Sequence, residues 1–188
     1  RPACSPDSSH LAFVARVGGW EEPTDEEERE RSRPPRVIDI LKYKSNGTGF
    51  IYDRPGQIFV VGVDGGPPRQ LTDGPFEHEH PAWSPDGRWL AFSSARHPER
   101  DEDTAADLWI VPAEGGERTQ VTKCTDDVHR PCLAWDRKTV AFELVGRLYV
   151  ADLDAPAAAP TPLPLTVQSD LRNSGLELRT ITSGGEHV

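Results

Sequence analysis

The sequence contains no methionine and only three cysteines, and none of its apolar runs is long. A membrane-spanning helix needs about 20 consecutive apolar residues, so we expect no membrane partner. No charged, apolar and small-residue segment opens the chain as a secretory signal would. Because position 1 is Arg1 and no initiator methionine occurs, we expect the chain to be a piece of a longer product.

Basic residues are also outnumbered: 21 Lys and Arg stand against 31 Asp and Glu, which gives a net charge of −10. That charge repels phosphate backbones, so we expect no nucleic-acid partner. The cysteines are too few, and odd in number, for a disulfide framework. We expect Cys4, Cys124 and Cys132 to be free thiols, although Cys124 and Cys132 could meet across a short connection.

The hydrophobic content of 36%, with five tryptophans, indicates a globular protein with a real core. The stretch "PAWSPDGRWLAFSS", residues 81–94, reads as a strand, a tight turn at Asp86-Gly87 and a second strand. An Asp-Gly pair tolerates the positive φ that two-residue hairpin turns require, so we expect a two-residue connection.

This hairpin belongs to an internal repeat. A shift of 50 residues lays "QIFVVGVDGGPPRQLT" (57–72) on "DLWIVPAEGGERTQVT" (107–122). The same shift lays the segment 80–94 on 130–144, so two independent segments agree on one offset. A shift of 79 then brings "PACSPDSSHLAFVA" (2–15) onto the hairpin. The extra length comes from residues 18–50, which we interpret as a loop insertion.

Each repeat reads as four short antiparallel strands, which is the pattern of a β-propeller blade. A β-sandwich also strings short strands together, but it gives no reason for a repeat at a fixed offset. We therefore predict an all-β fold: about three propeller blades plus the start of a fourth, from a six- to eight-bladed propeller. The predicted units are blade one 1–72, blade two 73–122, blade three 123–166 and the start of blade four 167–188.

The repeat also resembles a known family. The hairpin at 81–94, followed by "DLWIVPAEGGERTQVT", is similar to the propeller repeats of prolyl oligopeptidase-family serine peptidases, in particular their acylaminoacyl-peptidase-like branch. "LKYKSNGTGF" (41–50) strengthens this resemblance, which covers about residues 1–125. Residues 126–188 are more similar to TolB-like and tricorn-type propeller repeats.

The peptidase resemblance implies a propeller that caps an α/β-hydrolase domain and restricts access to short peptides. The catalytic Ser, Asp and His of the family belong to that second domain, and no Gly-x-Ser-x-Gly elbow occurs in these 188 residues. We therefore expect no catalytic residue in this chain. The leading hypothesis is a propeller segment that gates and selects peptide substrates for a hydrolase domain outside it.

Alternatives to this function remain. The chain could be a TolB-like protein-interaction module, or it could precede a tricorn-type peptidase. The partner is then a peptide substrate reached through a downstream hydrolase domain, or another protein, and open blade faces allow self-association. We expect no cofactor. We expect a cytoplasmic location, or a periplasmic one if the TolB-like alternative holds.

The segment "EHEH" (77–80) is a weak candidate for a metal site, because His78 and His80 share one face of an extended segment. A closed zinc site needs about four ligands, and no second pair has suitable spacing. The segment lies just before the first hairpin of a blade, where the family that the repeat resembles has a polar connection, and we favour that interpretation.

The acidic run from Glu21 to Glu30 could attract a cationic peptide, although a solvated loop is the simpler interpretation. The possible substrate-attracting acids are Glu21, Glu22, Glu26, Glu27 and Glu28.

Other recurring residues are interpreted as structural. Trp83, Trp89 and Trp109 stand at repeat positions and are expected in the packing of the blades. Recurrent aspartates and glycines suit turns, where carboxylates accept backbone hydrogen bonds and glycine adopts unusual φ. The predicted turn residues are Asp7, Asp86, Gly87, Asp136, Gly65, Gly66, Gly115 and Gly116.

Overall fold

The computed structural model describes residues 2–19, 23–136, 138–156 and 158–165. It contains three four-stranded antiparallel sheets, one for each repeat. The strands of these sheets are β1 (Ala3–Cys4), β2 (His10–Arg16), β5 (Gly56–Gly62), β6 (Arg69–Gln70), β7 (Glu79–Trp83), β8 (Trp89–Ser94), β9 (Asp107–Pro112), β10 (Thr119–Gln120), β11 (Val128–Leu133), β12 (Thr139–Leu144), β13 (Arg147–Asp152) and β14 (Thr161–Pro162).

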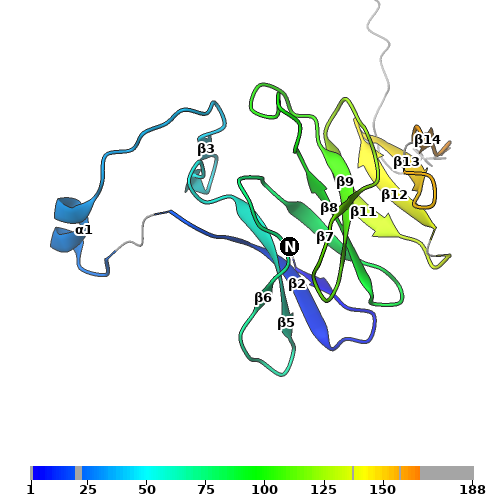
Figure 1. The fold of residues 1–188 in the computed structure, drawn as a ribbon, viewed down its shortest axis with the longest axis horizontal. Coiled ribbons are helices and arrows are strands. Elements are labelled where there is room, and N and C mark those ends of the chain that lie inside the picture. The colour runs from blue at the N-terminus through cyan, green and yellow to red at the C-terminus, as the bar shows by residue number, and fades with distance from the viewer. Residues whose placement is uncertain (1, 20–22, 137, 157, 166–188) are drawn as a thin grey trace, which may run out of the picture.

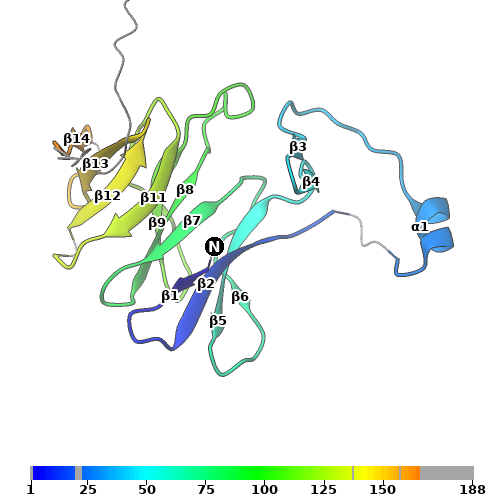
Figure 2. The ribbon, with the colours of Figure 1, turned by 180° about the vertical axis from the view of Figure 1, so that it is seen from behind.

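Each sheet is a simple meander. The strand orders are β1-β2-β5-β6, β7-β8-β9-β10 and β11-β12-β13-β14, so every strand pairs with its neighbour in the sheet's sequence order. The sheets stand side by side like the blades of an open fan, with β7 between β2 and β11 (Figures 1 and 2). The predicted all-β propeller architecture is confirmed. The predicted start of a fourth blade, 167–188, lies outside the described residues.

The turn after the first strand of each blade is held by an aspartate. In blade one, Asp7 accepts hydrogen bonds from Ser5 Oγ (2.6 Å) and from the backbone N–H of Ser9 (3.1 Å). In blade two, Asp86 accepts from Ser84 Oγ (2.7 Å) and from the N–H of Arg88 (3.1 Å). Because hydroxyl and amide donors stabilise the anion, the pKa of Asp7 falls to about 2.

The turns are longer than the two-residue connection that the Asp-Gly pair suggested. In blade two, the N–H of Ser84 donates to the carbonyl of Trp89, which closes a loop of four intervening residues. The positive φ falls on Gly87 (70°), and on Ser8 (60°) at the matching position of blade one. In blade three Ala134 replaces the serine, and Asp136 instead accepts from Thr139 Oγ1 at 2.6 Å.

A second recurring hydrogen bond joins the third strand of a blade to a threonine that follows the fourth strand. The N–H of Ile58 donates to Thr72 Oγ1 at 2.8 Å, and the N–H of Leu108 donates to Thr122 Oγ1 at 2.9 Å. Both threonines are buried, so each satisfies a backbone donor that would otherwise be costly to bury. The paired glycines of the preceding turns all have φ between 93° and 131°, namely Gly65, Gly66, Gly115 and Gly116.

Two hydrophobic cores lie between the blades. The first joins blades one and two and contains Ile58, Leu90, Phe92 and Val111, all with 0% exposure. The second joins blades two and three; its buried residues are Ala91, Leu108, Val121, Val128, Leu133, Val140, Phe142 and Ala151. Blade two is therefore apolar on both faces, as the sandwiched position of its sheet requires.

The recurring tryptophans differ in their burial, and the cysteines form no disulfide among the described residues. Trp83 and Trp109 pack against the first core. Trp89 was expected in the blade packing, but it is 36% exposed because it begins β8 directly after the turn. The three cysteines are free thiols.

The insertion leaves blade one after β2 and returns at β5. It contains the helix α1 (Glu26–Ser32) and a two-stranded hairpin, β3 (Lys44–Ser45) with β4 (Gly49–Phe50). The acidic run was expected to be a loop, but α1 forms because Asp25 caps Glu28 N–H at 2.8 Å and glutamates occupy the first turn. The helix buries no residue and stands away from the blades (Figure 1). No helix among the described residues is long and apolar enough to cross a membrane.

Candidate functional site: a polar cleft at the start of the inner strands

The first strands of blades two and three share an irregularity. The pairing of β7 with β8 shifts register between Glu79 and Ala82, and β11 shifts against β12 between His129 and Cys132. His80 (φ 55°) and Arg130 (φ 50°) occupy equivalent positions in these bulges, each before a proline. A left-handed backbone costs about 1–2 kcal/mol at a residue with a Cβ. Such bulges re-aim side chains, and here they border a cleft.

The cleft has a volume of about 410 Å³ and lies beside the first strands of the three blades, β1, β7 and β11. It contains charged side chains of both signs among apolar residues and prolines. The lining residues are Pro2, Ala3, Val14, Arg16, Glu77, Glu79, His80, Pro81, Arg130 and Pro131.

One wall of the cleft is an ion pair between Arg16, at the end of β2, and Glu77, before β7. The guanidinium donates to both carboxylate oxygens, at 2.6 and 3.0 Å. Glu77 also accepts from the N–H of Gly56 at 3.0 Å, and Arg16 donates to the carbonyl of Arg54 at 3.0 Å. These bonds fix the pair in place, so it shapes the cleft and links blade one to the connection that enters blade two.

His80 is the half-buried imidazole of the cleft. Its Nδ1 lies 3.1 Å from Ser93 Oγ, and Ser93 Oγ donates to the carbonyl of Glu79 at 3.3 Å. The hydroxyl proton is thus used, so His80 Nδ1–H donates and Nε2 keeps its lone pair. Burial lowers the pKa of His80, and its ring meets that of His129 edge-on at 5.1 Å. His80 is therefore a neutral acceptor at pH 7.

The charges of the cleft are balanced. Arg130 donates to Glu143 at 2.6 Å, and 76% of its side chain remains exposed. Glu79 is exposed at the strand edge. With His80 neutral, two arginines and two glutamates line the cleft, so its charges would complement a ligand that carries both a positive and a negative group. The lining residues include no serine, threonine or cysteine, so the cleft contains no nucleophile of those types.

The two candidate metal ligands are not brought together. His78 has 0% exposure, and its Nδ1 bonds the carbonyl of Gly56 at 3.2 Å, whereas His80 lies in the cleft. The alternation expected of an extended segment fails because β7 begins only at Glu79 and bulges at once. No group of three or more His, Cys, Asp and Glu side chains suited to a metal occurs in the described part of the chain.

The candidate substrate-attracting acids lie elsewhere. Glu26, Glu27 and Glu28 form the first turn of α1, which carries its own arginine partners at Arg29 and Arg31. Glu21 and Glu22 lie outside the described residues. No motif in the sequence selects Arg16 or Arg130, but the recurrence of a basic residue before the proline of each blade (Arg1, His80, Arg130) was a usable signal.

The three sheets define a β-propeller fold, and a polar cleft lies beside the first strands of its blades. No family model matches the sequence. A curated relative, the uncharacterized peptidase YuxL of Bacillus subtilis, is 33% identical over 112 residues. This alignment covers 59% of the present chain and only 17% of YuxL. The chain therefore spans a small part of the length of that relative.

Solved propellers share the fold. A structure described as TolB of Agrobacterium tumefaciens superposes with a TM-score of 0.52 at 17% identity, over 85% of this chain and 47% of that one. The β-propeller domain of the Trilobed protease of Pyrococcus furiosus gives 0.51 at 11% identity, over 87% and 41%. An acylaminoacyl peptidase gives 0.50 at 12% identity, over 83% and 23%. The chain is a propeller domain similar to those of such peptidases and of TolB, as the repeat had predicted.

Proposed function

We propose that this chain is the propeller segment of a serine peptidase and that it selects peptide substrates for a catalytic hydrolase domain outside the described residues. The alignment with the peptidase YuxL supports this proposal most directly. The cleft supports it on chemical grounds, because its balanced charges and neutral imidazole suit a peptide backbone. The bulges in β7 and β11 place the side chains of His80 and Arg130 in the lining of the cleft, where they could contact a peptide.

The first test is made on the natural gene product. Its intact mass is measured by denaturing mass spectrometry before and after treatment with a fluorophosphonate, which labels activated serines. We expect a mass several times 20.8 kDa and one covalent label. A product of 20.8 kDa that takes no label would overturn the peptidase assignment.

The gating role has a separate test in the labelled product. His80→Ala and Arg130→Ala are expected to change the ratio of kcat/KM for long against short peptides, because they widen the cleft. Turnover of a small activated ester should be unaffected, since the ester needs no selection by the propeller. If both variants leave the ratio between peptide lengths unchanged, the cleft does not select substrates.

A TolB-like interaction module is the second candidate, and the likeness to the TolB structure favours it on fold alone. It predicts a gene product without a reactive serine that binds a folded protein through the propeller. The fluorophosphonate experiment separates the two candidates.

A further inference from the structure

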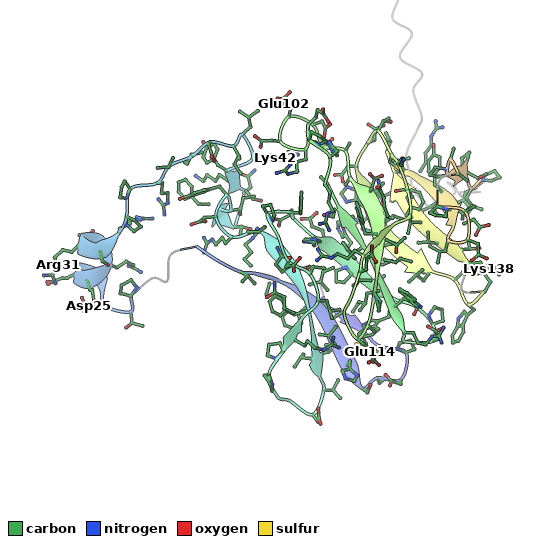
Figure 3. All side chains as sticks on the ribbon, viewed as in Figure 1. Asp25, Arg31, Lys42, Glu102, Glu114 and Lys138 are labelled. Atoms are coloured by element: carbon green, nitrogen blue, oxygen red, sulfur yellow. The ribbon has the colours of Figure 1, made fainter. Side chains whose placement is uncertain are left out.

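Hydrogen bonds fasten the insertion of blade one to a loop of blade two. The backbone N–H groups of Leu41 and Lys42 donate to the Asp101 carboxylate at 2.7 and 2.8 Å. Lys42 Nζ also donates to the carbonyls of Arg100 and Asp103. Figure 3 shows Lys42 beside the loop that carries Glu102. We call residues 37–43 the strap; its anchored end has a defined place over the molecule.

Beneath the anchored end of the strap lies a groove of about 250 Å³. Its floor and walls are mainly apolar and come from the strap, from the end of the insertion and from the connections around blade two. The lining residues are Ile40, Lys42, Ile51, Tyr52, Pro55, Pro75, Glu77, Ala95, Arg100 and Asp101.

The groove adjoins the polar cleft. Glu77 lines both, and its bonds to Arg16 and Gly56 N–H make it a fixed wall between them. A ligand in the cleft would therefore have the apolar groove next to it, on the other side of Glu77.

We propose that this groove binds one large apolar side chain, of leucine or phenylalanine size, from a short extended peptide held in the polar cleft. The proposal rests on the proposed function and adds a preference that the cleft alone does not supply. The cleft recognises the peptide backbone and its charges, and the groove recognises one side chain.

The size of the groove selects this occupant. Pockets for whole small-molecule ligands usually have volumes of about 300–1,000 Å³, so a groove of 250 Å³ is suited to a single side chain. A helix or a folded domain does not fit beneath the strap. The charged lining groups already have partners within the chain. Lys42 Nζ donates to two carbonyls, and Asp101 accepts from two backbone N–H groups. Glu77 pairs with Arg16, and Arg100 donates to the carbonyl of His97, so an apolar occupant takes no partner away from a charge.

The strap also offers backbone contacts. No hydrogen bond joins the backbone of residues 37–40 to another described residue, and no helix or turn occurs there. Ile40 is 37% exposed at the groove, whereas Val37 is 78% exposed and does not line it. An extended peptide beside Ile40 can pair with these free N–H and C=O groups, as peptides do at exposed strand edges.

The test is an NMR titration of the 15N-labelled 188-residue chain with pentapeptides Ala-Ala-X-Ala-Ala, where X is Leu, Phe, Ser or Asp. The Leu and Phe peptides should bind about tenfold or more tightly than the Ser peptide, because an apolar side chain leaves water. Their shifts should include residues 40–42, 51–55 and Ala95. Ile40→Asp should remove the preference, and Val37→Asp, a matched change on the same strap, should keep it.

The possible results separate this proposal from the proposed function. Equal binding of all four peptides, with shifts only at His80 and Arg130, overturns the groove and leaves peptide binding by the cleft in place. Loss of preference in both Ile40→Asp and Val37→Asp also overturns the groove, since the effect would then belong to the strap as a whole. If no peptide binds, both the groove and peptide recognition by the cleft fail. Asp101→Ala, which removes the acceptor of the Leu41 and Lys42 N–H groups without altering Ile40, should weaken the preference; an unchanged preference would show that the anchor does not form the groove.

Discussion

The carboxylate of Asp86 stabilises the turn between β7 and β8 in blade two. It accepts from Ser84 Oγ and from the N–H of Arg88, and 17% of its side chain is exposed. Asp86→Ala leaves these donors without their acceptor, so we expect a loss of about 1–2 kcal/mol in the free energy of unfolding. Urea denaturation measures it. Glu102→Ala, on an exposed loop, is the control and should change stability by no more than about 0.5 kcal/mol.

The buried residue His78 makes the free energy of unfolding depend on pH. It has 0% exposure, its Nε2 bonds no described group, and burial lowers its pKa from 6.5 to about 4. The unfolded chain therefore takes up the proton first as the pH falls. The stability associated with neutral His78 is complete above about pH 6.5 and is lost progressively toward pH 4, by about 3 kcal/mol.

The His78→Leu variant tests this dependence. Its free energy of unfolding should fall less steeply than that of the parent between pH 6.5 and pH 4, because no imidazole titrates there. The carbonyl of Gly56 still accepts from the N–H of residue 78, so the backbone remains bonded. Parallel curves for the two proteins would contradict the assignment of this slope to His78.

At the scale of elements, the insertion is separable from the blade that carries it. The N–H of Val17 donates to the carbonyl of Pro55 at 3.4 Å, so the chain returns close to where it left, and α1 buries no residue. Replacing residues 18–54 with the twelve-residue loop 95–106 of blade two should leave the far-UV circular dichroism of the strands and the cooperative unfolding transition intact. Loss of the transition would mean that the insertion holds the blades together.

The same loop-replacement variant also tests the proposed groove. It removes Ile40 and the strap, so the preference for apolar peptides should disappear while the cleft keeps its bulges. A retained unfolding transition together with a lost preference for apolar peptides would show that the insertion recognises ligands and is not needed for the fold.

The repeat explains why the elements were predictable and the site was not. Strands and turns recur at fixed offsets because each depends on local chemistry, such as Asp86 in its turn or Gly115 at positive φ. The bulge at His80 depends on the pairing of β7 with β8, and the groove depends on Lys42 meeting a loop 58 residues away. Contacts of that kind join segments that are distant in the sequence, so no local sequence pattern predicts them. Helix α1 was missed for a different reason, since its acidic composition also suits a solvated loop.

For the whole molecule, the repeat register identifies which outer faces are built for a neighbour. In blade two, Leu90 and Leu108 are fully buried on opposite faces of the sheet. Leu11 matches Leu90 on the outer face of blade one, and Leu148 matches Leu108 on the outer face of blade three. No described element covers Leu148, which is 40% exposed. Leu11 and Leu148 therefore occupy positions that are core positions in blade two, and no described blade packs on the outer side of either.

We therefore expect the chain to associate with itself or with a partner through these outer faces, and the matched leucines provide the test. Leu148→Ser should lower self-association, measured by sedimentation velocity over a concentration series, and should cost little stability because the site already contacts water. Leu108→Ser, at the same register in blade two, should lower the free energy of unfolding by about 3–5 kcal/mol, because it opens a cavity and buries a hydroxyl. If Leu148→Ser destabilised the chain as strongly as Leu108→Ser, the outer face of blade three would already be packed within one copy of the chain. A monomer at every concentration would likewise contradict self-association and would leave the faces for a different partner.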